Sequence, residues 1–245
     1  MKERCSNNLL YKGDCIEILK TLNSNSIDLI FADPPYFLSN GGKSIHSGKV
    51  VSVNKGDWDD KTQYDDHIEF TRTWLKESYR VLKYNGSIWI SGTVHNIFDI
   101  KNLLDEIGYK IINIVVWHKS DPPPLIYKNK LKFSYELIIW ASKGFKHTFN
   151  YNDMFKINND ELQDVWTIPA VQMNEKKFGY HPTQKPEALL ERIIKACSNP
   201  NETVLDPFSG SGTTCYVAKK LNRKYIGIEK DKNFFSISQR RVDSI

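Results

Sequence analysis

Residues 204–214 read Val204-Leu205-Asp206-Pro207-Phe208-Ser209-Gly210-Ser211-Gly212-Thr213-Thr214. An apolar run ends at this turn and a helical pattern follows it, which is how doubly wound α/β folds bring their backbone close to a nucleotide-like ligand. Gly210 and Gly212 permit dihedral angles and a close approach that a Cβ atom would block. Two glycines alone are more typical of a structural turn, so the residues around them decide the interpretation.

The turn lacks the signatures of phosphate-binding loops. Cys215 stands where a dinucleotide fingerprint has its third glycine, and no lysine follows to complete a P-loop. Asp206 would repel a pyrophosphate but attract a positively charged amino group, which suits the methionine end of S-adenosylmethionine. Glu229 follows the next predicted strand, where this fold places a carboxylate that accepts both ribose hydroxyls. The segment therefore predicts S-adenosylmethionine as the cofactor and argues against a dehydrogenase.

A second motif, Asp33-Pro34-Pro35-Tyr36, follows the apolar run 27–32 and should lie at the carboxyl edge of the same sheet. The prolines fix φ and remove backbone donors, so the Asp33 carboxylate and the Pro34 carbonyl remain as rigidly displayed acceptors. Such acceptors can hold the protons of a base amino group and aim its nitrogen at a methyl sulfonium. Taken alone, the motif is as typical of an ordinary turn as of a functional site. Together with residues 206–214, it predicts amino-group methylation.

The same motif predicts how the base is held. Tyr36 supplies an aromatic face, and stacking on a splayed base is worth about 1–3 kcal/mol. A base inside a duplex cannot reach this position, so base flipping is expected. Alignment of nitrogen, methyl carbon and sulfur supplies most of the catalysis without a covalent nucleophile. We therefore interpret all four cysteines as structural: Cys5, Cys15, Cys197 and Cys215.

Hydrophobic periodicity predicts alternating strands and helices. We predict strands at 27–32, 87–91, 110–117, 137–141, 203–205 and 225–228, and helices at 64–82, 97–107, 187–196, about 213–221 and at the C-terminus. This alternation favours one domain over 1–245 with a mostly parallel sheet. Two stretches break the pattern: 37–60, expected to be a mobile loop, and 120–180, expected to contain a target-recognition region. Surface elaboration without function is the alternative for both.

Composition excludes several classes of protein. A chain of 245 residues, 40% hydrophobic, fits a single α/β domain. The balance of 34 basic and 29 acidic residues favours a polyanionic partner only weakly. The scattered cysteines predict neither a metal site nor a disulfide framework. The same scattered cysteines fit a reducing compartment, so we expect a cytoplasmic protein. No apolar run reaches the roughly 18 residues of a membrane span, so we expect no membrane partner.

Three motifs in their order along the chain resemble the β class of DNA amino-methyltransferases. They are Asp33-Pro34-Pro35-Tyr36, then His181-Pro182-Thr183-Gln184-Lys185-Pro186, then Asp206-Pro207-Phe208 with Gly210-Ser211-Gly212-Thr213-Thr214. The resemblance spans nearly the whole chain. It implies a Rossmann-like S-adenosylmethionine methyltransferase fold, with a seven-stranded, mostly parallel sheet and a reversed edge strand.

The resemblance also assigns residues to the cofactor. Besides Asp206, Gly210, Gly212 and Glu229, it implies contacts from Asp14, Cys15, Thr183, Lys185, Pro207, Phe208, Thr213 and Thr214. Asp14 would lie near the adenine ring of the cofactor, with Cys15 packed beside it. A helix N-cap is an equally good explanation of Asp14 and is compatible with this contact.

The details of the resemblance concern the substrate. Asp rather than Ser before Pro-Pro-Tyr resembles adenine-N6 rather than cytosine-N4 enzymes. Residues 31–40 and 50–59 resemble the second methylase of DpnII-type restriction systems, whose members modify adenine in GATC and accept single-stranded DNA. The expected partners are single- or double-stranded DNA, a second copy of the chain in a homodimer, and a cognate restriction endonuclease. The alternatives are a cytosine-N4 enzyme, a GANTC-type adenine enzyme, an RNA or protein amino-methyltransferase, and a non-catalytic nucleic-acid-binding regulator.

Overall fold

The computed structural model describes residues 8–36, 43–46, 49–52, 64–122, 124, 129, 131–158 and 162–245. In chain order the elements are β1 Leu9–Lys12, α1 Cys15–Thr21, β2 Ile27–Ala32, β3 Lys43–His46, β4 Lys49–Ser52, α2 Tyr64–Val81, β5 Leu82–Gly92, α3 Ile97–Ile107, β6 Lys110–His118, β7 Tyr135–Ser142, α4 Tyr151–Asn158, β8 Val165–Thr167, the 3-10 helix η2 Met173–Lys176, α5 Glu187–Cys197, β9 Thr203–Asp206, α6 Thr213–Lys220, β10 Lys224–Glu229 and α7 Lys232–Asp243.

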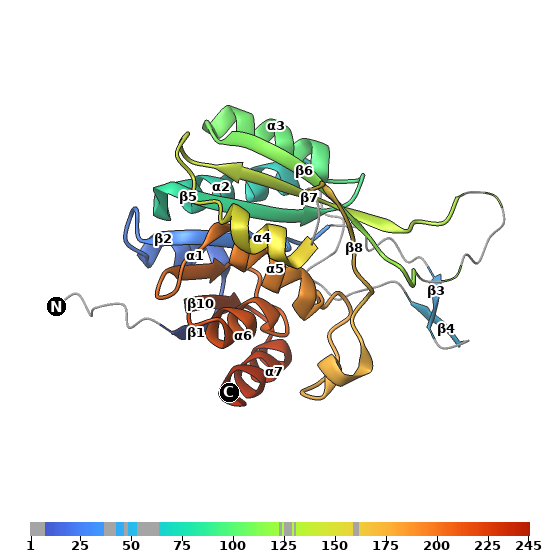
Figure 1. The fold of residues 1–245 in the computed structure, drawn as a ribbon. Helices are drawn as coiled ribbons and strands as arrows, with labels where there is room; N and C mark the ends of the chain where they lie inside the picture. The colour runs from blue at the N-terminus through green and yellow to red at the C-terminus, as the bar shows by residue number, and fades with distance from the viewer. Residues whose placement is uncertain are drawn as a thin grey trace.

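A single large sheet organises these elements, in the order β1-β10-β9-β2-β5-β7-β6-β8, with helices on both faces (Figure 1). Every neighbouring pair of strands is parallel except the two pairs that β7 makes with β5 and β6. The predicted fold class is confirmed. The sheet has eight strands rather than the expected seven because the short β8 adds to the edge at β6, and the reversed strand β7 lies inside that edge.

Buried strands explain why the sheet is covered on both faces. All six residues of β2 are buried, which is typical of a central parallel strand. Successive side chains of a strand point to opposite faces. Ile30 accordingly packs with residues of α1, α2 and α3, whereas Leu29 and Phe31 pack with residues of α5 and α6.

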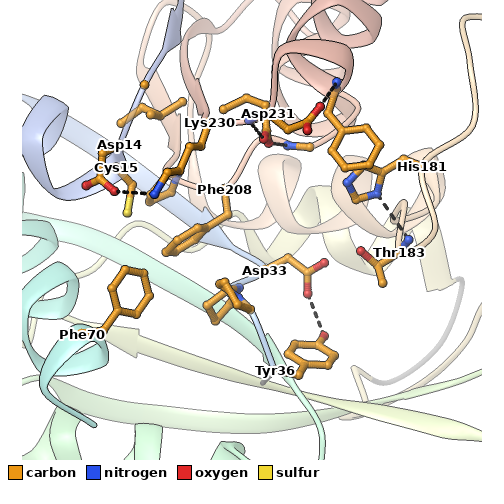
Figure 2. A pocket seen from close by; sticks show the side chains of 18 of the residues that line it. Asp14, Cys15, Asp33, Tyr36, Phe70, His181, Thr183, Phe208, Lys230 and Asp231 are labelled. Carbon is orange, nitrogen blue, oxygen red and sulfur yellow. Dashed lines mark hydrogen bonds and ion pairs between the residues drawn. The ribbon is translucent and has the colours of Figure 1, made fainter. Parts of the chain in front are cut away.

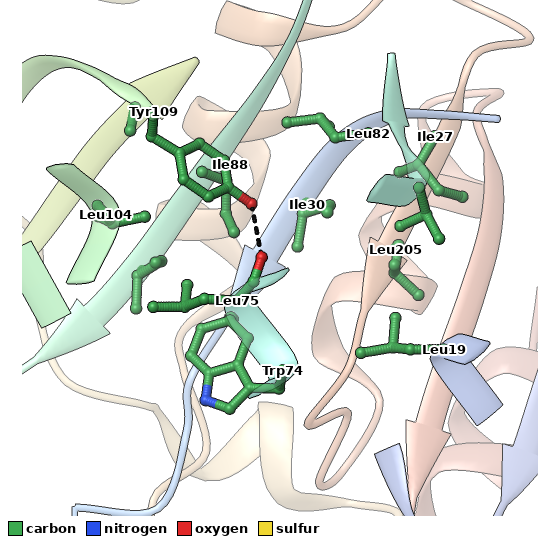
Figure 3. Packing of buried hydrophobic residues seen from close by; sticks show 14 of the residues in the cluster. Leu19, Ile27, Ile30, Trp74, Leu75, Leu82, Ile88, Leu104, Tyr109 and Leu205 are labelled. Atoms are coloured by element: carbon green, nitrogen blue, oxygen red, sulfur yellow. Dashed lines mark hydrogen bonds between the residues drawn. The ribbon is translucent and has the colours of Figure 1, made fainter. Parts of the chain in front are cut away.

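The hydrophobic cluster around Ile30 holds α2 against the sheet. Figure 3 shows Leu75 of α2 beside Ile30, and the Tyr109 hydroxyl donates to the Leu75 carbonyl at 3.2 Å. Trp74 and Leu75 are fully buried. Burial of such side chains contributes about 1.5–3 kcal/mol each, so the helix is fixed where its first turns face the carboxyl edge of the sheet.

The predicted elements are present, and several boundaries match. β2 and α3 span the predicted residues, and Gly108 ends α3 in the left-handed region at φ 103°. Asp14 is the predicted N-cap of α1, since its carboxylate accepts from the amides of Ile16 and Glu17. β5 starts at Leu82, directly after α2, and is longer than predicted.

Other elements were not predicted: β1, the antiparallel pair β3 and β4, α4, β8 and η2. The stretch 120–180 thus contains more regular structure than its weak periodicity indicated. Within the predicted loop 37–60, only β3 and β4 are described, and 37–42, 47–48 and 53–60 lie outside the described residues. The mobility of that loop stays a prediction. No helix in the described part of the chain is long and apolar enough to cross a membrane.

Candidate active site

A pocket of about 830 Å³ opens where β2, β9 and β10 end and the helices after them begin (Figure 2). Its walls include eleven of the predicted site residues: Asp14, Cys15, Asp33, Pro34, Pro35, Tyr36, Thr183, Pro207, Phe208, Gly210 and Glu229. Five others do not line it: Lys185, Asp206, Gly212, Thr213 and Thr214. The fold therefore brings the Asp33 motif and the glycine turn to one cavity, although they are far apart in sequence.

The Asp33 carboxylate is held by two donors. Its Oδ1 atom accepts from the Tyr36 hydroxyl at 2.7 Å, and its Oδ2 atom accepts from Lys185 Nζ at 2.5 Å. Tyr36 is only 8% exposed, and burial together with the charge of Asp33 raises its pKa, so the phenol keeps its proton and donates. Burial alone would lower the pKa of Lys185, but the carboxylates of Asp33 and Glu136 outweigh burial and raise it. Lys185 is therefore an ammonium behind the pocket wall.

The Asp206 carboxylate organises the glycine turn from behind the pocket. Its Oδ1 atom accepts from the Phe208 amide at 2.9 Å, and its Oδ2 atom accepts from Thr214 Oγ1 at 2.5 Å. Burial raises the pKa of Asp206 to about 7, and the nearby charges of Asp33 and Glu229 act in the same direction. At neutral pH this carboxyl group is therefore protonated in part of the molecules.

Gly210 and Gly212 both need to be glycine for geometric reasons. Their φ angles are +51° and +79°, a region that side chains with a Cβ rarely adopt. A Cβ at Gly210 would lie 3.0 Å from Nε2 of His181, and one at Gly212 would overlap Ser238 Oγ. The turn therefore packs against the loop before α5 on one side and against α7 on the other. Thr213, which begins α6, accepts from the buried Arg241 of α7 at 3.1 Å.

Glu229 ties the end of β10 to the glycine turn. Its Oε2 atom accepts from the Gly210 amide at 2.8 Å, and its Oε1 atom accepts from the Asp231 amide at 2.7 Å. Burial raises the pKa of Glu229. Each carboxylate oxygen can accept a second hydrogen bond, so Glu229 keeps acceptor capacity on the pocket wall.

One end of the pocket is apolar and aromatic. Phe208 lies between Phe70, with ring centroids 6.3 Å apart, and Trp74, with an edge-to-face contact at 5.3 Å. Cys15 lies at this end, and burial and the charge of Asp14 raise its pKa to about 12, so it is a thiol (Figure 2). Lys230 Nζ lies 3.6 Å from the Asp14 carboxylate at the exposed rim. A flat ring system with polar edge atoms fits this end of the cavity.

Several pocket residues were missed from sequence: Asp66, His67, Phe70, His181, Lys230, Asp231 and Phe234. His181 begins the motif that contains Thr183, and the Thr183 amide donates to His181 Nδ1 at 3.3 Å, so its place in that motif was a usable signal. Glu136 was also missed, although it is the only charged residue in β7, which is mostly apolar.

Cysteine and metal chemistry have little support in the described residues. Burial raises the pKa of the Cys197 and Cys215 thiols, which agrees with a structural role, while Cys5 lies outside the described residues. Among the residues described here, no group of three or more His, Cys, Asp and Glu side chains is arranged to hold a metal ion.

The Asp33 motif and the glycine turn, which line one cavity, occur in a chain whose sequence resembles known proteins. The DNA methylase family model matches residues 27–240. The chain belongs to the DNA methylase family. This DNA methylase is 47% identical over 239 residues to the Type II methyltransferase M2.MboI of Moraxella bovis, covering 96% of this chain and 88% of that protein. It is 45% identical over 240 residues to the Type II methyltransferase M2.DpnII of Streptococcus pneumoniae, covering 96% and 90%. The predicted resemblance to the DpnII-type group is confirmed.

Solved structures agree with the fold of this DNA methylase. The crystal structure of an M1.HpyAVI-SAM complex is 27% identical, with a TM-score of 0.72, covering 96% of this chain and 98% of that chain. The PvuII DNA methyltransferase (cytosine-N4-specific) is 21% identical, with a TM-score of 0.78, covering 96% and 86%, and shows the fold alone. The chain is thus a DNA methyltransferase with a fold shared across this family.

Proposed function

We propose that this DNA methylase transfers the methyl group of S-adenosylmethionine to N6 of adenine in DNA, within GATC, as part of a restriction-modification system. The observation that carries the proposal is that Asp33 and the glycine turn at Pro207–Gly210 line one pocket. The reaction needs two parts in one place: acceptors that orient the amino group, and a turn whose backbone can lie close to the cofactor. The names of the relatives, which include M2.DpnII and M2.MboI, favour the DpnII-type site.

The residues present fit S-adenosylmethionine. The aromatic end around Phe70 and Phe208 suits its adenine ring, with Asp14 and Cys15 at the ring edge. Glu229 has the acceptor capacity for ribose hydroxyls. Gly210 leaves open a position that a Cβ atom would fill, next to the ring of His181, whose Nδ1 atom accepts from the Thr183 amide. Asp206 would act at the methionine end through the turn that it holds, because both its oxygens already bind residues of that turn.

When bound, this cofactor supplies a sulfonium-activated methyl group, whose carbon–sulfur bond breaks as the new nitrogen–carbon bond forms. Asp33 and the Pro34 carbonyl orient the amino group by accepting its hydrogen bonds, and the carboxylate is the nearest base for the proton that the amino nitrogen loses. Tyr36 stacks on the extruded base and keeps Asp33 in place through its hydroxyl. Lys185 holds the other oxygen of the same carboxylate.

The choice of adenine rests on Asp33, since Ser before Pro-Pro-Tyr resembles the cytosine-N4 enzymes. The same interpretation includes a single methyltransferase domain over 1–245, a mobile loop at 37–60, and a recognition region within 120–180. A homodimer, a cognate endonuclease for the same site, and a cytoplasmic location belong to the proposal as well. Light scattering of the purified protein tests the dimer.

The deciding experiment follows labelled methyl from S-adenosylmethionine into single-stranded and duplex oligonucleotides that contain GATC, GANTC or neither, with nucleoside digestion afterwards. We expect N6-methyladenine confined to GATC, with activity on the single strand. Label in N4-methylcytosine would overturn the base assignment while keeping the reaction class. Label in GANTC would reassign the site, and no label in any of the DNA oligonucleotides would overturn DNA as the substrate in favour of RNA or protein.

A further inference from the structure

The Asp33 carboxylate lines the pocket and also belongs to a network of polar side chains that extends behind the pocket wall. Hydrogen bonds and ion pairs connect the members of this network in a closed ring. Lys185 Nζ lies 2.5 Å from Asp33 and 3.5 Å from Glu136 Oε2. Ser91 Oγ donates to the same Glu136 oxygen at 3.3 Å and lies 3.1 Å from the Tyr36 hydroxyl, which returns to Asp33. Lys119 adds a second ammonium, 2.6 Å from Glu136 Oε1.

The reversed direction of β7 brings Glu136 to this place. Because β7 runs antiparallel to β5, its first residues lie beside the last residues of β5, and Leu137 pairs with Gly92. Parallel strands bring only their carboxyl ends to this edge, so a reversed strand is needed to add a residue from a strand's beginning. Glu136 thereby faces the catalytic motif from a different strand.

The charges in this network alternate and are largely removed from water. The side chains of Asp33, Lys185, Glu136 and Lys119 are 14%, 6%, 15% and 19% exposed. Burial would raise the pKa of Glu136, but Lys185 and Lys119 outweigh burial and lower it to about 2, so Glu136 is a carboxylate. A buried ammonium between two carboxylates is shared between them, whereas one with a single carboxylate pairs with it alone.

We propose that Glu136 is a positioning residue for methyl transfer, which acts through Lys185 to set the orientation of the Asp33 carboxylate and its availability to the substrate amino group. The proposal rests on the proposed role of Asp33. Without the negative charge of Glu136, Asp33 is the only carboxylate left to pair with Lys185. The ammonium then holds Asp33 more tightly, so the carboxylate is less free to accept a hydrogen bond from the substrate amino group.

The test compares Glu136→Gln with the wild-type enzyme and with Glu191→Gln as a matched control. Glu191 forms an ion pair with Lys195 at 2.6 Å on α5 and is not part of the network. We expect Glu136→Gln to lower kcat roughly 10- to 100-fold, the effect of small misplacements in an active site. The Kd for S-adenosylhomocysteine and the KM for a GATC oligonucleotide should stay near wild type, and Glu191→Gln should match wild type throughout.

The pH profile separates positioning from a merely structural role. The charged and titratable groups that face Lys185 are Asp33 and Tyr36 after β2 and Glu136 of β7, with Lys119 acting through Glu136. Losing Glu136 removes one of the two carboxylates that oppose the effect of burial on Lys185. The basic limb of the kcat profile should therefore move to lower pH in Glu136→Gln and return toward wild type in Glu136→Asp.

A double variant, Glu136→Gln with Lys119→Gln, avoids leaving Lys119 without a carboxylate and should show the same loss of kcat. Wild-type kcat with an unshifted basic limb in either folded variant overturns the proposal. If neither variant binds S-adenosylhomocysteine, the network serves stability alone and the proposal also fails. Asp33→Ala, assayed in parallel, tells the two proposals apart, because an active Asp33→Ala enzyme would overturn the proposed function itself.

Discussion

The Nζ atom of Lys185 lies 2.5 Å from Oδ2 of Asp33, although 152 positions separate the two residues along the chain. This ion pair joins the motif after β2 to the loop before α5, where His181 and Thr183 line the same pocket. The Asp33 carboxylate is therefore positioned by a residue from a distant part of the chain, next to the loop that supplies another wall of the pocket. Four predictions follow from this geometry and from that of the glycine turn.

Asp33→Ala should lower the rate of methyl transfer by about two to three orders of magnitude and leave cofactor binding largely intact. The substitution removes the acceptor for the amino group, and losing one such preorganised group costs on the order of 100- to 1000-fold in rate. Glu136 still pairs with Lys185, which limits the structural damage. Single-turnover transfer and calorimetry with S-adenosylhomocysteine measure the two effects, and transfer retained near the wild-type rate would contradict the mechanism.

Tyr36→Phe and Tyr36→Ala should differ in a defined way. Phenylalanine keeps the stacking face and loses the hydroxyl that binds Asp33 and Ser91, so it should lower kcat more than it weakens DNA binding. Alanine also loses stacking, worth about 1–3 kcal/mol, and should weaken capture of the base. The fluorescence of 2-aminopurine at the target position reports base extrusion. Equal extrusion in both variants would exclude a stacking role.

Gly210→Val should remove both cofactor binding and methyl transfer. A β-branched residue at φ +51° is strained by roughly 1–3 kcal/mol, and its Cβ atom would press on the His181 ring at the pocket wall. Gly210→Ala carries the same backbone strain with a smaller side chain and should retain more binding. Calorimetry with S-adenosylhomocysteine compares the two variants, and thermal unfolding checks that both fold. Normal affinity in the valine variant would exclude cofactor contact at this turn.

Asp206→Asn should flatten the dependence of stability on pH. The pKa of Asp206 is raised from 3.8 to about 7 by burial, so the folded state holds this proton more tightly than the unfolded state. Its contribution to the free energy of unfolding is fully present below 3.8 and is lost as pH rises to about 7. As pH rises over this interval, the Tm of the wild-type protein should therefore fall relative to the Tm of Asp206→Asn. A constant difference would show that Asp206 has no raised pKa.

The sequence predicted the strands and helices that carry the site because their signals are local. The buried run at β2 and the glycine that ends α3 need no tertiary context. The pairing of strands is not local, so neither the inner place of β7 nor the start of β5 at Leu82 could be read from periodicity. Short elements such as β8 and η2 form through contacts with neighbours rather than through their own pattern.

Side-chain roles were predicted less well than positions. Asp206 was expected to face the cofactor, yet both its oxygens bind residues of its own turn. Lys185 was expected on the pocket wall, but it lies behind Asp33. Asp206 and Lys185 differ from expectation for the same reason. A buried charged group needs hydrogen-bonding partners, and both residues find them within the folded chain.

The two ends of the β6–β7 hairpin are fastened at the catalytic edge, where the Lys119 amide donates to the Ser134 carbonyl at 2.7 Å and the Lys119 ammonium meets Glu136. Changing the length of the connection between such fixed ends costs little, about 0.6 kcal/mol for each doubling. The length of the connection between β6 and β7 can therefore change at little cost to stability, because both of its anchor points stay tied to each other and to Glu136.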